Sequence, residues 1–426
     1  MAKKIEADFL LINAGQLITA GGNSDHPKRG DQLAEIGLIN DGAVAARDGV
    51  IVAVGPTSDL RQSVELMEGA LLIRARGKVV LPGLVDPHTH LVFAGSREHE
   101  LEMKIQGASY LEILARGGGI LDTVRSTRAA EHEELIRIGR EYLDEMLAQG
   151  TTTIEAKSGY GLTLRDEVKM LDVIRALQET HPVDIQPTFL GAHAVPEEYK
   201  EDADGFVELV AREMLPAVSS LGLARFCDVF CEEGVFSVAQ TRRILTEAKR
   251  LGFELKIHAD EMAPLGGAEL AAELGATSAD HLMMISDKGI EMLAASDTIA
   301  VLLPATTFCV MGERYAPARE MIEKGVAVAL STDFNPGSSP VNSLQIVMGI
   351  ACRCLKMTPA EVISAVTINA AHAMGSAASV GSIEVGKKAD LVIFDAYDYR
   401  YLMYRFGTNL VDQVVKCGRI VAGGQC

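Results

Sequence analysis

The sequence predicts an α/β protein: a (β/α)8 TIM-like barrel with a small β-sandwich domain formed by the N- and C-terminal segments. Three observations predict it. From Val79 onward, short β-branched runs alternate with amphipathic helical stretches, which is typical of parallel strands joined by crossover helices. There are eight such runs, enough to close a barrel. Both ends of the chain are instead rich in short strands and turns.

The barrel strands are predicted from apolar runs at 83–85, 151–155, 184–189, 226–230, 254–257, 276–279, 299–303 and 326–330. Helices are predicted between them, among others at 131–148, 165–179, 238–251, 267–274 and 287–295. An open doubly wound sheet is the alternative. It is disfavoured because no Gly-rich phosphate loop follows a strand.

The ends of the chain are predicted to pair with each other. Two β-prone runs flank an Asp48-Gly49 turn, which is a hairpin signal. Residues 383–395 and 411–421 form similar turn-bearing units. The predicted division is therefore 1–78 and 379–426 for the two parts of the β-sandwich domain, with the barrel at 79–378 inserted between them.

Composition excludes several classes of function. The 426 residues carry a formal net charge of −18, and such an acidic surface repels phosphate backbones, so no nucleic-acid partner is expected. The sequence shows no signal peptide and no segment that could span a bilayer, so no membrane partner is expected. The seven cysteines show no disulfide framework. A reduced, cytoplasmic location is expected.

The first candidate site residues are two histidines at the end of the first barrel strand. His88 and His90 follow the apolar run that begins at Val79. Side chains alternate along a strand, so residues two apart face the same way. Both imidazoles can therefore address one metal ion, and imidazole suits zinc or iron.

Other polar residues follow later strands, where the active site of such a barrel lies. Three histidines and an aspartate fit one metal ion with a position left for water, which the metal would activate as hydroxide near neutral pH. Glu261, three residues beyond His258, is placed to shuttle protons. The candidates at these later strand ends are His193, His258, His281 and Asp333.

Lys157 raises a competing interpretation. It follows the second barrel strand, and a carboxylated lysine there would bridge two metal ions. The sequence favours one metal, because Asp333, the third histidine and Glu261 already account for a one-metal mechanism.

At these residues the chain resembles the amidohydrolase superfamily. The segments PGLVDPHTH, HADE, STDFNPG and GSIEVGKKADLVIFD carry the resemblance. More closely, HTHLVFAGSREHE, AKSGYGL and STDFNPG are similar to the imidazolonepropionase family of histidine degradation. The similarity runs over nearly the whole chain.

The resemblance implies hydrolysis of 4-imidazolone-5-propanoate to N-formimidoyl-L-glutamate. It also implies one zinc or iron ion held by His88, His90, His258 and Asp333. The substrate contacts that it implies are Arg97, Tyr110, Tyr160, His193, Glu261, Asn335, Gly337 and Ser338. A homodimer is expected.

The residues fit this chemistry. Arg97, seven residues beyond His90, is placed to clamp the carboxylate tail of the substrate with a bidentate fork. Asp333 and His281 would flank the attacking water as base and oxyanion stabiliser, and Glu261 would protonate the leaving ring nitrogen. Which of His281 and Asp333 is the base stays open.

Two rival functions remain. A nucleobase deaminase of the same superfamily would share the metal site but would not need Arg97 for a carboxylate. A non-catalytic scaffold with a decayed metal site is the other, and the full ligand set argues against it.

Overall fold

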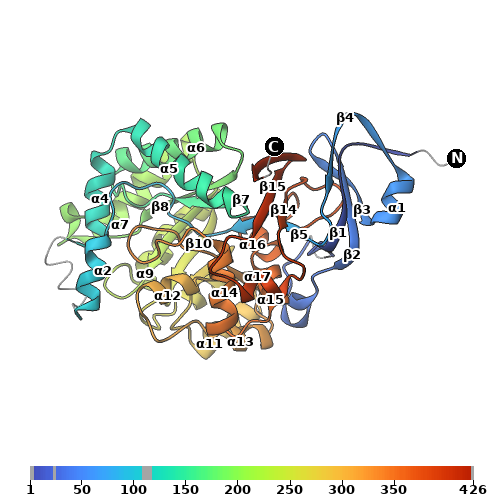
Figure 1. The fold of residues 1–426 in the computed structure, drawn as a ribbon. Coiled ribbons are helices and arrows are strands. Elements are labelled where there is room, and N and C mark those ends of the chain that lie inside the picture. The colour runs from blue at the N-terminus through green and yellow to red at the C-terminus, as the bar shows by residue number, and fades with distance from the viewer. Residues whose placement is uncertain (1–3, 23–24, 108–117, 424–426) are drawn as a thin grey trace.

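The computed structural model describes residues 4–22, 25–107 and 118–423. It consists of a barrel and a smaller β-sheet unit beside it (Figure 1). The N-terminus lies at the far side of the smaller unit, and the C-terminus lies between the two (Figure 1).

The barrel contains eight parallel strands in sequential order, as the sequence predicted. Neighbouring strands pair from the first to the last. They are β6 (Leu84–Asp86), β7 (Thr151–Lys157), β8 (Asp184–Ala192), β9 (Phe226–Cys231), β10 (Glu254–Ala259), β11 (Ser278–His281), β12 (Ile299–Leu302) and β13 (Val328–Leu330). The strand β11 begins and ends two residues later than predicted, and His281 is its last residue.

Helices surround the barrel strands. The predicted helices correspond to α5, α6, α9, α10 and α11. The full set of described α-helices on the barrel and its C-terminal extension is α2 (Glu98–Ile105), α4 (Ile120–Ala129), α5 (His132–Ala148), α6 (Leu164–Thr180), α7 (Ala203–Leu209), α8 (Leu215–Leu221), α9 (Val238–Arg250), α10 (Gly267–Leu274), α11 (Asp287–Ala294), α12 (Pro304–Cys309), α13 (Ala318–Glu323), α14 (Leu344–Cys354), α15 (Pro359–Ala365), α16 (Ile368–Ala373) and α17 (Arg400–Tyr404).

The barrel is closed by the segments that follow its first and last strands. The amide of Asp333 donates to the carbonyl of His88 at 3.1 Å, and the amide of His90 donates to the carbonyl of Phe334 at 2.9 Å. Beneath them, the Asp86 carboxylate accepts from the Thr332 amide at 3.1 Å and from the Thr332 hydroxyl at 2.7 Å. Closure therefore fixes the two segments that carry predicted metal ligands against each other.

The smaller unit combines both ends of the chain, as predicted. Its strands run in the order β16-β15-β14-β5-β1-β2-β3, and β4 pairs with β1. The Asp48-Gly49 turn joins β2 and β3, with both residues at positive φ. The strands are β1 (Ile5–Ile18), β2 (Leu38–Arg47), β3 (Val50–Pro56), β4 (Val64–Arg74), β5 (Val79–Pro82), β14 (Leu391–Phe394), β15 (Val411–Lys416) and β16 (Arg419–Gly423), with α1 (Thr57–Ser63) after β3.

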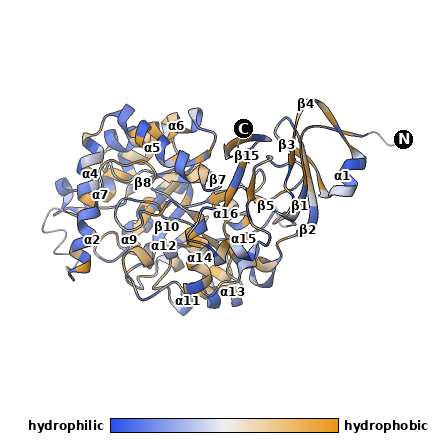
Figure 2. Cartoon of the chain, viewed as in Figure 1, coloured by the Kyte–Doolittle hydropathy of each residue, from blue (hydrophilic) through white to orange (hydrophobic). Residues whose placement is uncertain are grey.

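Apolar side chains fill both units. Phe9 and Leu11 from the N-terminal part share a buried cluster with Leu391, Ile393 and Val415 from the C-terminal part, so neither end of the chain completes this core alone. The strands are mostly hydrophobic and the outer helices carry much of the hydrophilic colour (Figure 2). Among the described residues, no helix is long and apolar enough to cross a membrane.

Partly buried ion pairs join the two units. Asp184, the first residue of β8, accepts from Lys416 at 2.6 Å and from Lys388 at 2.8 Å. Lys416 also pairs with Asp390 at 2.5 Å, and the side chains of Lys416 and Asp390 are nearly fully buried. The smaller unit is thus anchored to the barrel by charge as well as by apolar contacts.

We predict that Lys416→Met destabilises the protein without changing the active site. Breaking a buried pair typically costs about 3–5 kcal/mol, and partial exposure of Asp184 places the expected loss in the free energy of unfolding near the lower limit. Denaturant unfolding measures it. Lys388→Met, which removes the more exposed partner of Asp184, is the matched control with a smaller loss. Equal stability of Lys416→Met and the wild type would contradict the anchoring role.

Candidate metal centre and active site

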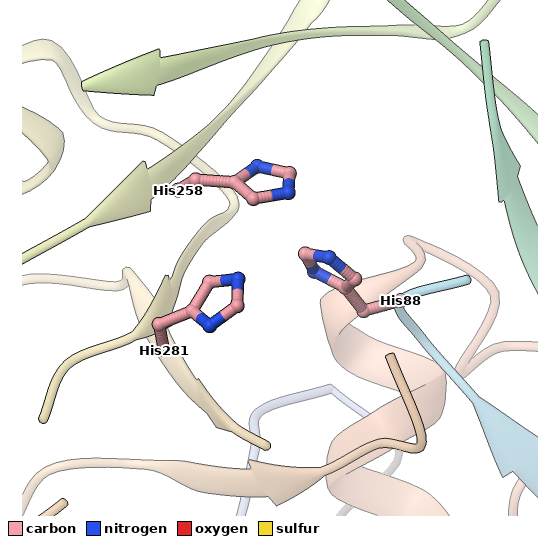
Figure 3. A group of neighbouring side chains, drawn as sticks. All are labelled: His88, His258 and His281. Atoms are coloured by element: carbon pink, nitrogen blue, oxygen red, sulfur yellow. The ribbon is translucent and has the colours of Figure 1, made fainter. Parts of the chain in front are cut away.

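Three buried histidines from three strands point into one space at the carboxyl end of the barrel. They are His88, after β6, His258 of β10 and His281 of β11, and Figure 3 shows their rings facing one another. The ring centroid of His88 lies 4.5 Å from that of His258 and 5.4 Å from that of His281. One nitrogen from each ring lies within 4.8 Å of the other two. The barrel thus brings distant histidines together.

Asp333 and His90 extend this group. Asp333 Oδ1 lies 3.4 Å from His88 Nε2 and 3.5 Å from His90 Nε2. The hydroxyl of Thr306 donates to the other oxygen, Asp333 Oδ2, at 2.7 Å, which holds the carboxylate in place. The two imidazoles outweigh burial and keep the pKa of Asp333 well below its usual range. Asp333 is therefore an anionic ligand candidate.

The buried imidazole nitrogens of this cluster fit a metal ion. His88 Nε2 and both ring nitrogens of His281 are buried without a hydrogen-bond partner. Buried polar atoms without a partner are costly, and neutral imidazole with a carboxylate is a donor set that zinc or iron accepts. Within the described part of the chain, four overlapping groups could hold a metal: His88 with His258 and His281, His88 with His90 and Asp333, His90 with His193 and His258, and His88 with Glu155 and Asp280.

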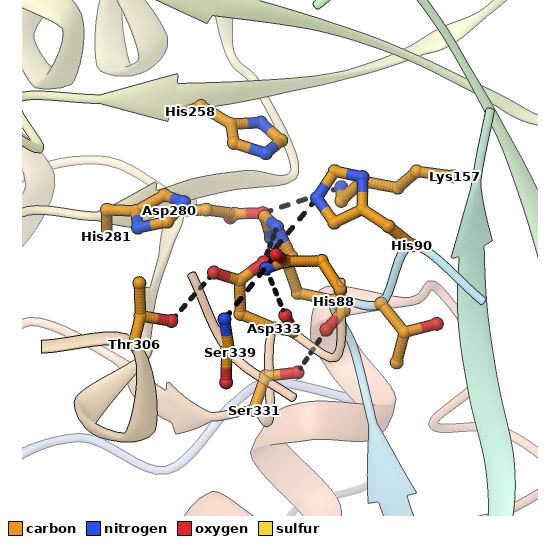
Figure 4. Close-up of polar contacts among 12 residues, drawn as sticks. His88, His90, Lys157, His258, Asp280, His281, Thr306, Ser331, Asp333 and Ser339 are labelled. Atoms are coloured by element: carbon orange, nitrogen blue, oxygen red, sulfur yellow. Dashed lines mark hydrogen bonds and ion pairs between the residues drawn. The ribbon is translucent and has the colours of Figure 1, made fainter. Parts of the chain in front are cut away.

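Two aspartates orient the imidazoles. His88 Nδ1 shares a hydrogen bond of 2.6 Å with Asp280 Oδ2. His258 Nδ1 lies 2.9 Å from Asp228 Oδ2 without hydrogen-bond geometry, and the backbone amide of His258 donates to Asp228 Oδ1 at 3.2 Å. An imidazole that gives its Nδ1–H to a carboxylate presents its Nε2 lone pair to a metal. Figure 4 shows Asp280 beside Lys157 and the histidine cluster.

Lys157 is engaged by carboxylates, which bears on the two-metal alternative. Its ammonium lies 2.7 Å from Asp228, 3.0 Å from Glu155 and 3.6 Å from Asp280. Burial opposes the charged form, but these carboxylates outweigh it and raise the pKa of Lys157 above its ordinary value. Carboxylation requires a neutral amine, so the arrangement disfavours a bridging carboxylated lysine.

Arg97 lies at the start of α2 and is held by Glu100. Arg97 Nε and one terminal nitrogen donate to the two oxygens of Glu100, each at 2.8 Å. A Cβ atom placed on Gly337 would lie 2.1 Å from the other terminal nitrogen, Arg97 Nη1. A guanidinium has five N–H groups, so the edge formed by its two terminal nitrogens remains available for an anion.

Tyr160 and His193 line the site beside His90. The rings of His90 and His193 stack at 4.8 Å, and the Tyr160 ring lies 5.3 Å from that of His193. His193 Nδ1 lies 3.1 Å from the carbonyl of Gly159. Burial lowers the pKa of His193 well below its usual value and raises that of Tyr160. Both side chains are therefore neutral.

Glu261 and His281 form the opposite side of the site. Glu261 Oε2 lies 3.7 Å from His281 Nδ1, and Glu232 accepts the Glu261 amide at 3.0 Å. Burial, together with the charges of Asp333 and Glu232, raises the pKa of Glu261 to about 8. Burial lowers the pKa of His281 well below its usual value. At neutral pH the carboxyl therefore holds a proton and the imidazole is neutral.

The loop after Asp333 is built around Asn335. Its side chain donates to the carbonyl of Asp333 at 2.7 Å and accepts from the amides of Gly337 and Ser338 at 2.9 and 2.8 Å. Asn335 thus shapes the loop, and its contact with substrate stays a prediction, as does that of Ser338. Tyr110 lies outside the described residues.

Sequence patterns did not identify several buried charged residues of the site. They are Glu100, Glu155, Asp228, Lys256 and Asp280, all buried. The available signal was a charged residue inside an apolar strand, as in Phe226–Cys231 and Ser278–His281. That pattern indicates an inward-facing charge, but it does not reveal the partner.

Two family models match the chain. The model described as "Amidohydrolase family" matches residues 79–421, and the one described as "Imidazolonepropionase-like composite domain, bacteria" matches residues 42–63. The imidazolonepropionase of Alkaliphilus oremlandii is 53% identical over 97% of this chain and 98% of its own length. That of Shouchella clausii is 55% identical over 97% and 93%.

Solved structures share the fold. A zinc-bound adenosine deaminase from Xanthomonas campestris aligns over 99% of this chain and 94% of its own, with a TM-score of 0.71 and 20% identity. A 5-methylcytosine deaminase from Klebsiella pneumoniae, liganded with 5-fluorocytosine, aligns over 98% of each chain, with a TM-score of 0.72 and 16% identity. At this identity they show the fold alone, whereas the amidohydrolase model matches residues 79–421 and the curated relatives align over 97% of the chain: it belongs to the amidohydrolase family and, within it, to the imidazolonepropionases.

Proposed function

We propose that this chain hydrolyses the cyclic amide of 4-imidazolone-5-propanoate to N-formimidoyl-L-glutamate, in histidine degradation. The observation that carries the proposal is the arrangement of a cluster of buried histidines and a guanidinium edge at the same end of the barrel. The cluster suits a metal ion and the guanidinium suits a carboxylate. The relatives named imidazolonepropionase, 52–55% identical over nearly the full length, support it.

The residues that would hold the metal are His88, His90, His258 and Asp333, and the metal would be one zinc or iron ion. When bound, it supplies Lewis acidity and a hydroxide near neutral pH. His281 stays outside this set in the proposal, although its unpartnered nitrogens also face the centre.

The protein residues would handle the charge and the protons. Arg97 binds the propanoate carboxylate through the edge between its two terminal nitrogens, which faces away from Glu100, while Tyr160 and His193 line the ring pocket. Oxygen adds to the ring carbonyl carbon, with Asp333 taking the proton of the water and His281 stabilising the oxyanion. The C–N bond of the amide then breaks, and Glu261 gives its proton to the leaving ring nitrogen.

The rival deaminase shares the fold and a metal-binding cluster. A carboxylate anchor distinguishes the two functions, because nucleobases carry no carboxylate. The pairing of Arg97 with Glu100 at the start of α2 therefore favours the imidazolone substrate.

We also propose a homodimer in the cytoplasm. Tyr397 and Tyr404 are each about three-quarters exposed beside Tyr401, and exposed aromatic clusters favour protein contacts. The described cysteines are free, as expected in a reducing compartment. The mass in solution, by light scattering, would equal two chains.

The first test combines turnover with metal analysis. We expect the purified protein to contain about one zinc or iron ion per chain. We also expect it to consume 4-imidazolone-5-propanoate, and the loss of the substrate's absorbance measures this turnover. We expect His258→Ala to lose both metal and turnover, because it removes one predicted ligand. Ammonia release from guanine or cytosine with no imidazolone turnover would establish the deaminase instead. Full metal occupancy in His258→Ala would show that His258 is not a metal ligand.

A second prediction concerns Gly337. A methyl group there would displace the Arg97 guanidinium, which can move because it ends a flexible side chain. Gly337→Ala should therefore raise KM at least ten-fold with little change in kcat or thermal stability, since a charge-assisted hydrogen bond contributes about 1.5–3 kcal/mol. Gly407→Ala is the matched control, because a Cβ atom there meets nothing within 4 Å. An unchanged KM would place the anchor elsewhere.

A third prediction uses pH. Because the pKa of Glu261 is raised to about 8, the proton donor is present at neutral pH and is lost as the pH rises through that value. The kcat of the wild type should fall on the alkaline side. Glu261→Gln cannot transfer a proton, so kcat should fall by about 10²–10⁴ and the alkaline decline should disappear. Wild-type kcat in Glu261→Gln would assign the donor to another group.

A further inference from the structure

A group of five charged side chains lies inside the barrel, directly beneath the histidines. Its members, which we call the core ion cluster, are all fully buried: Glu155, Lys157, Asp228, Lys256 and Asp280. They come from the strands β7, β9, β10 and β11. None of them is assigned to binding substrate or metal, and a fully buried charge persists only with partners.

The contacts within the core ion cluster are specific. Lys157 contacts three carboxylates, at 2.7 Å for Asp228, 3.0 Å for Glu155 and 3.6 Å for Asp280. Lys256 lies 3.1 Å from Glu155 and donates to the Pro87 carbonyl at 3.2 Å. Lys157 is thus the cation shared by Asp228 and Asp280.

Those two aspartates are the ones that contact imidazoles, Asp280 by a hydrogen bond to the His88 ring and Asp228 by a ring contact and a hydrogen bond from the His258 amide. Asp280 Oδ2 lies 2.6 Å from His88 Nδ1. Asp228 Oδ2 lies 2.9 Å from His258 Nδ1, and its other oxygen accepts the His258 amide at 3.2 Å. Glu155 holds no histidine; its second oxygen accepts from the Thr188 hydroxyl. One ammonium therefore connects the supports of two imidazoles from different strands.

We propose that Lys157 is a positioning residue of the metal centre: it fixes Asp228 and Asp280 so that His258 and His88 present Nε2 to the same point. Without the ammonium, two carboxylates that approach the same place in the barrel would repel each other and turn away. The imidazoles that they hold would then lose their common orientation. This inference rests on the proposed metal centre. It gives a positioning role to the lysine that the two-metal alternative treated as a metal ligand.

The test measures metal binding rather than turnover. Zinc affinity is determined by competition with a chromophoric chelator, and ligand geometry from the visible spectrum of the cobalt-substituted protein. We expect Lys157→Met and Asp280→Asn each to bind zinc about 10–100-fold more weakly, the usual loss when a partner of a metal-bound histidine is removed. Both should change the cobalt spectrum.

Lys28→Met is the matched control. Lys28 is also almost fully buried, but it donates to the Glu35 carbonyl outside the barrel centre. Loss of a buried lysine there should lower the unfolding midpoint and leave zinc affinity and the cobalt spectrum unchanged. A merely structural role for Lys157 would produce the same pattern in Lys157→Met.

A second variant keeps the test decisive if Lys157→Met does not fold. The double variant Lys157→Met/Glu155→Gln removes the ammonium together with the carboxylate that holds no histidine, so the net charge of the core ion cluster is preserved. Wild-type zinc affinity and spectrum in the folded variants would overturn the inference. Absence of zinc binding in the wild type would instead overturn the proposed function.

Discussion

The ion pairs of Lys157 inside the barrel are the interaction on which the rest of the site depends. A barrel of parallel strands normally fills its interior with branched apolar side chains. Here that interior holds Lys157 between Asp228 and Asp280, with each aspartate against one imidazole. The arrangement is costly unless every charge is paired. The paired charges fix the geometry of the site, because a histidine held at Nδ1 by a fixed carboxylate can point its Nε2 in only one direction.

Buried carboxylates hold the other functional residues in the same way. Glu100 holds the guanidinium of Arg97. Glu167 accepts three backbone amides of the loop that carries Tyr160, at 2.8–3.1 Å. One oxygen of Glu232 accepts from the backbone amides of Glu261 and Met262. Loops are ordinarily the mobile parts of a barrel, so these acceptors give the proposed binding and catalytic side chains on loops the fixed placement that chemistry requires.

The sequence predicted the scaffold well because its signals are local. Alternation of apolar runs and amphipathic stretches depends on near neighbours, and all eight barrel strands follow it. The position of a histidine after a strand predicted that His88, His258 and His281 would meet, because the carboxyl ends of parallel strands share one face. Pairings across the barrel, such as Asp280 with His88, could not be predicted, since nothing near Asp280 in the sequence marks a residue 192 positions away. The same limit applies to Glu100, whose engagement of Arg97 decides which guanidinium edge is free.

The likeness to deaminases then has a physical explanation. Chains only 15–20% identical share this fold, so the strands and the interior they enclose cannot by themselves select a substrate. Selection must come from segments that follow the strands, where Arg97 and Gly337 pack against each other after the first and last strands of the barrel. The backbone bonds that close the barrel join those same two segments. Closure therefore ties the proposed carboxylate anchor to Asp333 of the metal centre, and the distance between the two sets the length of substrate that can reach both.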